Sequence, residues 1–249
     1  MRPLYVAGAP GVRLRLDGPS LVVEAPARAV RRYPLERLSQ VVLCGLVEAE
    51  LDALRACAMR GIPVGAMNAD GVPVGFFLPW RAPAPRASVL LEAFLERGDA
   101  PGRYRDWQRS QQRRAIIRAL RAAGLSPMRH LTPQPAMEAL MAQFAGPAAA
   151  AQVLKSWLGL AANVVQKKLT EFRLCPTLVA GRRRGIDLPA DLAELAAWGH
   201  YEAVRRLEPL PANRAEEVAA YEAQRPRDER FVHAVLENFL CWLGGMRWQ

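Results

Sequence analysis

The sequence lacks most patterns that mark redox, zinc-binding or nucleotide-hydrolysing proteins. Its four cysteines, Cys44, Cys57, Cys175 and Cys241, lie far apart and form no CxxC pair. This spacing excludes a zinc signature and a disulfide framework, and it favours buried thiols in a reducing compartment. No GxxxxGK(S/T), GxGxxG or GxSxG pattern is present, which argues against nucleotide-driven and serine-hydrolase chemistry.

The sequence also shows no targeting or membrane-spanning segment. The first residues, MRPLYVAGAPGV, contain no apolar signal core. No apolar run approaches the length that crosses a bilayer. We therefore expect a soluble, cytoplasmic protein with no membrane partner.

Lysine is scarce although the chain is strongly basic. Lys155, Lys167 and Lys168 are the only lysines, yet Lys and Arg together number 34 against 24 Asp and Glu, a net charge of +10. Nearly all the positive charge is therefore arginine, whose planar fork matches phosphate oxygens in two-point contacts. This favours a polyanionic partner, most simply DNA. Arginine-rich coding bias with solvated helix faces remains the alternative.

Residues 1–80 have the alternation typical of β-structure. Apolar side chains alternate with polar ones over residues 12–16 and again over residues 21–25, on either side of an Asp-Gly turn. Two such runs predict a hairpin. The contiguous apolar run LSQVVLCG, at residues 38–45, predicts a buried strand.

The stretch LRACAMRGIPVGAMNADGVPVG continues this domain. Residues 51–60 have helical spacing and end at Gly61, whereas residues 62–67 and 72–77 predict two short strands joined by a turn. The Pro-rich segment 81–88 predicts a linker, because proline disfavours helix before it. Residues 89–249 show helical patterning between proline and glycine breaks, and the last predicted helix, residues 227–245, begins directly after Pro226. The predicted fold class is α+β, a small N-terminal β-rich domain followed by an all-α domain.

This order of features resembles the CRISPR-associated integrase/endonuclease of the spacer-adaptation complex. The residues that carry the resemblance are the strand ending in Gly45, the following helix, the segment Gly61-Ile62-Pro63-Val64 and the turn glycine Gly71. The resemblance implies that residues 1–80 mediate homodimerisation and that the helical domain binds DNA. It also implies a divalent-metal site for Mg or Mn, built from a glutamate before a glycine, a later histidine and an acidic residue beyond it.

The family's ligands are incomplete in this sequence. Ala145 stands before Gly146, where the resemblance implies the glutamate, and no histidine occurs between Asn163 and Glu194. Asp191 and Glu194, three residues apart, match the family's acidic helix. A shifted alignment would give Glu138 or Glu171 the acidic role. The interpretation is a degenerate relative without an intact metal site, in which Asp191, Glu194 and Glu138 remain weak catalytic candidates.

Clustered cations are the predicted DNA contacts. Several arginines crowd one predicted helix, a triple-arginine segment is flanked by glycines, and two adjacent lysines lie on the helix before it. The predicted set is Arg103, Arg109, Arg113, Arg114, Arg118, Lys167, Lys168, Arg182, Arg183 and Arg184. Such a surface gives sequence-independent affinity that falls with salt. The alternative is that nearby acids, Glu92, Glu96 and Asp106 among them, pair with the arginines.

The other candidate side chains have simpler structural explanations. The three histidines are His130, His200 and His233; only His200 could join Asp191 or Glu194 at a metal, and a packed histidine is commoner. Trp157 and Trp242 lie in apolar helical patterns, whereas Trp80 and Trp248 are freer to stack on bases.

Three functions remain open from the sequence. The first is a dimeric DNA-binding scaffold that assists a catalytic partner, such as another CRISPR adaptation protein, in spacer capture or integration. The second is an active metal-dependent integrase or endonuclease. The third is a protein-binding module for which DNA contact is incidental.

Overall fold

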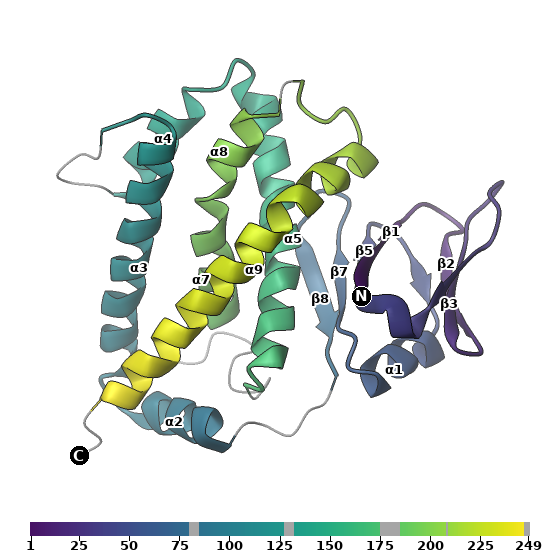
Figure 1. The fold of residues 1–249 in the computed structure, drawn as a ribbon, viewed down its shortest axis with the longest axis horizontal. Coiled ribbons are helices and arrows are strands. Elements are labelled where there is room, and N and C mark those ends of the chain that lie inside the picture. The colour runs from purple at the N-terminus through teal and green to yellow at the C-terminus, as the bar shows by residue number, and fades with distance from the viewer. Residues whose placement is uncertain (80–84, 127–131, 175–184, 208, 247–249) are drawn as a thin grey trace. The chain divides into compact units, whose positions relative to one another are not determined.

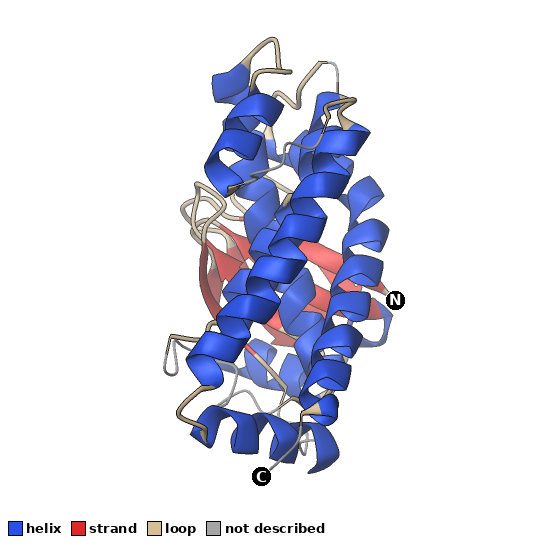
Figure 2. Ribbon diagram, turned by 90° about the vertical axis from the view of Figure 1, so that its left-hand side faces the viewer, coloured by secondary structure: helices blue, strands red, loops and turns tan. Residues whose placement is uncertain are grey.

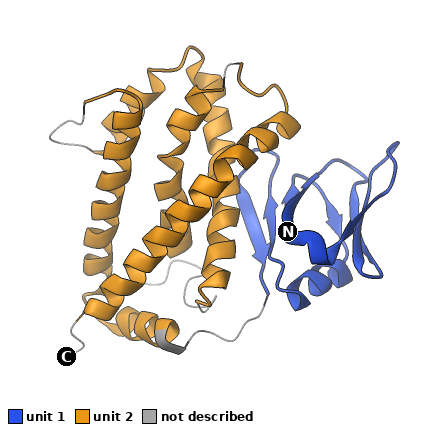
Figure 3. Ribbon diagram, in the orientation of Figure 1, with its two compact units in different colours: residues 1–82 blue, residues 83–249 orange. Residues whose placement is uncertain are grey.

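The computed structural model describes residues 1–79, 85–126, 132–174, 185–207 and 209–246 (Figure 1). The chain divides into two compact units, residues 1–82 and residues 83–249 (Figure 3). All described strands lie in the first unit, and the second is helical (Figure 2). The predicted fold class, a strand-rich region followed by a mostly helical one, is confirmed.

The first unit contains two four-stranded sheets, with strand orders β1-β5-β7-β8 and β4-β3-β2-β6. The elements are β1 (Arg2–Ala7), β2 (Arg13–Asp17), β3 (Ser20–Glu24), β4 (Arg31–Pro34), the 3-10 turn Leu35–Arg37, β5 (Leu38–Cys44), β6 (Glu48–Ala49), α1 (Leu51–Met59), β7 (Val64–Met67) and β8 (Pro73–Phe77).

The hairpin and the buried strand lie where the sequence predicts them. Strands β2 and β3 pair antiparallel with Asp17 opposite Ser20, and Gly18 adopts φ +57° in the turn between them. Strand β5 runs parallel between β1 and β7, so neighbours on both sides cover it. Strand β1 has no counterpart in the sequence analysis, because its proline and flanking glycine obscure a short alternating run.

Close backbone contact fixes the end of β1. A Cβ atom added at Gly8 would lie 2.5 Å from the carbonyl oxygen of Leu46, so no larger residue fits there without backbone movement. Cys44 and Cys57 are buried as expected, and burial raises the pKa of the Cys57 thiol to about 11. Cys241 is exposed, contrary to the expectation of a buried thiol, because it lies on the outer face of its helix.

The second unit is built from helices with one shared core. They are α2 (Pro85–Glu96), α3 (Ala100–Ala122), α4 (Pro133–Met141), α5 (Pro147–Glu171), α7 (Leu188–Ala197), α8 (His200–Arg205) and α9 (Arg214–Gly245). Helix α5 packs against α7, α8 and α9. By length and composition an 18-residue window of α5 could cross a membrane, but 56% of that window is buried, as in a core helix.

Two helix boundaries differ from the sequence expectation. Helix α2 begins at Pro85, inside the stretch predicted as a linker, because proline is tolerated in the first helical turn. Helix α9 begins at Arg214 and continues through Pro226. The Asn213 side chain caps it by accepting from the Glu216 amide, and the Glu216 carboxylate accepts from the amide of Ala212.

Candidate nucleic-acid interface

Helix α3 engages Asp191, the first acidic candidate. Asp191 lies in the first turn of α7, which the Asp187 side chain caps by accepting from the Ala190 amide at 3.2 Å. The Tyr104 hydroxyl donates to one carboxylate oxygen of Asp191 at 2.7 Å, and the Gln108 amide donates to the other at 2.6 Å. Both oxygens are therefore used to hold α7 against α3.

Glu194 lies one turn further along α7 and is more accessible to solvent. Partial burial raises its pKa, and the negative charges of Asp191 and Asp187 raise it further. Glu138 lies on α4 and accepts from Gln134 at 3.1 Å. In the part of the chain that the structure describes, no three His, Cys, Asp or Glu side chains gather closely enough to hold a metal ion.

Ala145 and Gly146 precede α5, and both are exposed. The alanine methyl group offers no ligand atom at the position where the resemblance implies a glutamate. Glu171, the other acid considered in a shifted alignment, bonds Lys168 at 2.7 Å at the opposite end of α5. Glu171 therefore does not restore the missing ligand at the start of this helix.

His200 is fully buried and belongs to a different cluster. Its Nε2 lies 2.8 Å from an oxygen of Asp228 on α9, and the Tyr221 hydroxyl donates to that oxygen at 2.9 Å. Gln224 donates to the other Asp228 oxygen at 3.2 Å, and the ring of Trp157 packs edge-on against His200. The structure thus places His200 in the helical core with Asp228, and not with Asp191 or Glu194.

Among the described residues, the remaining histidines and tryptophans form no catalytic cluster. His233 is exposed on α9 and lies 3.3 Å from Glu237. Trp157 is buried, and Trp242 is half-buried against the core. His130, Trp80 and Trp248 lie outside the described residues, as does the whole triple-arginine segment, Arg182, Arg183 and Arg184.

The α3 arginines are exposed and form two rows. The spacing of a helix places side chains three or four residues apart on one face. One row contains Arg105, Arg109 and Arg113, and the other contains Arg114, Arg118 and Arg121. Within the described residues, the second row and Arg113 form no salt bridge with a carboxylate. These four guanidinium groups are free to meet an anion.

Two predicted contacts on the same helix already have acidic neighbours. Arg103 bonds Asp99 at 2.6 Å, and Arg97 bonds the same carboxylate. These two guanidinium groups hold the pKa of Asp99 well below its usual range. Arg109 lies 3.9 Å from Asp106, with both side chains largely exposed. The pairing expected from Asp106 therefore occurs, but it involves only part of the α3 set.

The two α5 lysines are paired with acidic residues more closely than the α3 arginines are. Lys167 donates to Glu229 of α9 at 3.1 Å, and Lys168 donates to Glu171 at 2.7 Å. Burial opposes ionisation of Glu229, but the hydrogen bond from Lys167 and the charges of Lys167, Arg225 and Lys168 outweigh it and lower the pKa. The lysine side chains are only 17% and 13% exposed. Lys167 therefore stabilises the α5–α9 contact, Lys168 pairs within α5, and both present little charge to a ligand.

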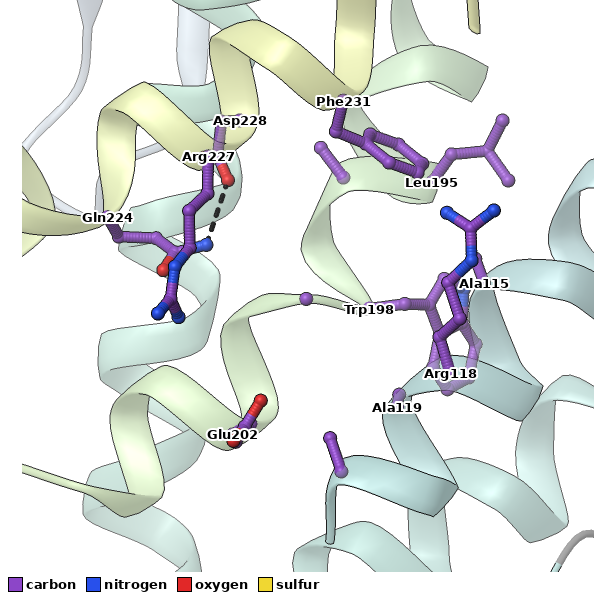
Figure 4. Close-up of a pocket in the computed structure, with 13 residues that line it drawn as sticks. Ala115, Arg118, Ala119, Leu195, Trp198, Glu202, Gln224, Arg227, Asp228 and Phe231 are labelled. Atoms are coloured by element: carbon purple, nitrogen blue, oxygen red, sulfur yellow. Dashed lines mark hydrogen bonds between the residues drawn. The ribbon is translucent and has the colours of Figure 1, made fainter. Parts of the chain in front are cut away.

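A pocket of about 240 Å³ lies beside the second arginine row. Arg118 of α3, next to Trp198, and Arg227 of α9, next to Gln224, approach it from different sides (Figure 4). Gln224 and Asp228 line its polar wall. Arg227 is a basic residue that the sequence analysis did not select, although Arg225 and Arg230 lie close to it in the sequence.

The comparisons with known proteins, by family model and by solved structure, point to the same fold. The family described as CRISPR associated protein Cas1 matches residues 4–95. No curated protein matches the chain in sequence. In fold, the chain is similar to TM1797, a Cas1 protein from Thermotoga maritima, with a TM-score of 0.77, 14% identity, and coverage of 99% of this chain and 98% of that one.

Two further solved structures share the fold. One is a casposase bound to integration product, with a TM-score of 0.68, 10% identity and coverage of 100% and 92% of the two chains. The other is TtCas1 in a DNA complex, with a TM-score of 0.61, 12% identity and coverage of 98% and 92%. The resemblance to the CRISPR-associated integrase is confirmed, and the Cas1 fold extends over nearly the whole chain.

Proposed function

We propose that this chain is a DNA-binding scaffold of Cas1 type that acts in spacer capture or integration without an intact family metal site. The observation that carries the proposal is the set of exposed, acid-free arginines on α3. Like charges on one helix face repel one another, so an anion that offsets them stabilises the surface. A phosphate backbone supplies such charges at regular spacing, and the fold is shared with a Cas1 protein in a DNA complex.

The described residues do not fit the metal that the fold family implies. Ala145 supplies no ligand atom, and both oxygens of Asp191 accept hydrogen bonds from Tyr104 and Gln108. Each Asp191 oxygen keeps a lone pair for a further contact, but a cation there would still lack two of the ligands that the family site implies. We therefore assign the helical unit the task of holding DNA and leave the chemistry to a second adaptation protein.

Homodimerisation through the first unit is part of the proposal. Leu46, Leu51, Met59 and Val74 are each at least 63% exposed in this unit, which is unusual for large apolar side chains. A second copy in a two-fold dimer would cover such side chains on both protomers at once. Two copies would also present two arginine surfaces to one DNA, in the cytoplasm where such DNA is found.

The alternative is an active metal-dependent integrase or endonuclease. The raised pKa of Glu194 favours it, because perturbed carboxyl groups concentrate at functional sites. On this alternative Asp191, Glu194 and Glu138 act together, and His200 would have to leave its bond to Asp228.

Binding and chemistry can be tested on one substrate. A labelled branched DNA is incubated with the full chain, with and without Mn²⁺, and both binding at two salt concentrations and strand-transfer or nicking products are measured. We expect salt-sensitive binding and no products. Metal-dependent products that disappear in the Asp191→Ala, Glu194→Ala double variant would establish the active integrase instead, and absence of binding at low salt would refute both DNA functions.

A further inference from the structure

The pocket beside the second arginine row has two chemically different sides (Figure 4). Leu195, Trp198 and Phe231 present apolar surface on one side, and Gln224 and Arg227 lie on the other. Its volume of about 240 Å³ is below the roughly 300 Å³ at which pockets for drug-sized ligands begin. A ligand that fits this pocket is therefore small and has one apolar end and one polar end.

Small residues in the lining account for the space inside the pocket. Ala115, Ala119 and Ala122 are spaced three or four residues apart, so they share one face of α3, and all three line the pocket. Gly199, which precedes α8, lines it without any side chain. Larger side chains at these positions would fill the space to the density of a packed core. The pocket therefore exists because small residues face the large apolar side chains of α7 and α9.

The acidic residues that line the pocket already have partners. Asp228 belongs to the buried cluster around His200 described above, and Glu202 accepts a hydrogen bond from Arg206. The hydrogen bond that Gln224 donates to Asp228 at 3.2 Å also fixes the orientation of the Gln224 amide. The polar wall is therefore held in place by the protein before any ligand binds, and its negative charges are offset.

The two arginines that line the pocket have no such partners. Arg118 and Arg227 are exposed, and neither side chain forms a salt bridge or hydrogen bond with another described residue. A pocket with paired acids and unpaired arginines attracts an anion. A guanidinium group binds a carboxylate through two parallel hydrogen bonds, and it also packs over the face of an aromatic ring. The lining thus offers one contact for an acid group and another for a ring.

We propose that this pocket binds a small aromatic carboxylic acid. The carboxylate lies on Arg227, and the ring lies against Trp198 and Phe231, where Arg118 packs over it. An inorganic anion has no apolar surface and would leave most of this lining without a contact, whereas an aromatic ring buries it. The site goes beyond the proposed DNA-binding function and does not depend on it, because neither the ligand nor the test involves DNA.

Two probes of the same shape test the contact with the acid group. Indole-3-propionate carries the ring and the carboxylate, and indole-3-propionamide carries the same ring with a neutral amide. Isothermal titration calorimetry on the full chain gives the dissociation constant of each probe. We expect the acid to bind about tenfold more tightly than the amide, because only the acid forms charge-assisted hydrogen bonds with Arg227.

Three variants locate the binding at the pocket. Arg227→Gln should weaken binding of the acid about tenfold and bring it close to that of the amide. Arg230→Gln removes an exposed charge from the same helix outside the pocket, so the dissociation constant should stay within about twofold. Ala122→Trp keeps every charge but fills the pocket, and it should abolish binding of both probes. Circular dichroism confirms that each variant is folded before its binding is compared.

Several results would overturn the inference. If the unaltered chain does not bind indole-3-propionate, or binds acid and amide equally, the pocket does not recognise an aromatic acid. If an equal concentration of inorganic phosphate displaces the acid, the arginines bind any anion and the ring contributes nothing. Unchanged binding in Ala122→Trp would place the ligand elsewhere. A chain that binds the acid but no DNA would refute only the proposed function, so the two proposals fail separately.

Discussion

The salt dependence of DNA binding gives the sharpest test of the α3 surface. Arg113, Arg114, Arg118 and Arg121 are exposed and form no salt bridges within the described structure. If each neutralises one phosphate, log K should fall with log salt at a slope of about −3.6. Raising the salt from roughly 50 to 200 mM then weakens binding about 150-fold. Replacing Arg114 and Arg118 by Gln should halve the slope and reduce the loss to roughly 12-fold.

A matched double variant distinguishes specific contacts from net charge. Arg103→Gln with Arg109→Gln removes the same charge from α3, but these arginines already face Asp99 and Asp106. We expect its slope to stay close to that of the unaltered chain. Binding isotherms at four salt concentrations, measured by fluorescence anisotropy, give each slope. Equal slopes in the two double variants would refute the assignment, because only total charge would then matter.

Three further predictions concern stability. Gly8→Ala should destabilise the first unit by about 2 kcal/mol in urea unfolding, whereas Gly75→Ala, which has open space around its Cβ position, should change it little. Asp228→Ala should lower the free energy of unfolding by about 4 kcal/mol, because it leaves the buried donors around His200 unsatisfied. A decrease below 1 kcal/mol would contradict the stabilising role of these hydrogen bonds. The lowered pKa of Glu229 means that its ionised form stabilises the fold above pH about 4.5. The unaltered chain should exceed the Glu229→Gln variant in free energy of unfolding by about 1 kcal/mol above that pH. This difference should disappear as the pH falls below that value. A difference that stays constant at all pH values would argue against the stabilising role of ionised Glu229.

The sequence predicted the fold best where local patterns decide the structure. Alternation on both sides of Gly18 defined the β2–β3 hairpin, and the apolar run of β5 indicated a strand covered on both sides. Prediction from the sequence failed where distant contacts or helix caps outweigh local residue patterns. Pro226 suggested a helix boundary, but the capping by Asn213 and the packing of α9 on α5 extend the helix through it.

The site was harder to predict because pairing partners are distant in sequence. Lys167 looked like a DNA contact, but its partner Glu229 lies 62 residues away. Asp191 was a weak catalytic candidate, but Tyr104, which lies 87 residues before it, donates to its carboxylate. The exposed α3 arginines were predicted more easily, since helical spacing alone places them in rows.

The order of the pairing partners along the chain has a consequence for biosynthesis. Every strand of the first unit finds its neighbour within residues 2–77. That unit can therefore complete its two sheets while the helical unit is still being translated. The helical unit cannot do the same, because α9, which covers α5 and contacts α2, is translated after the other described helices. Pausing translation before residue 214 should leave a folded first unit attached to an open helical bundle, with the apolar face of α5 exposed to chaperones.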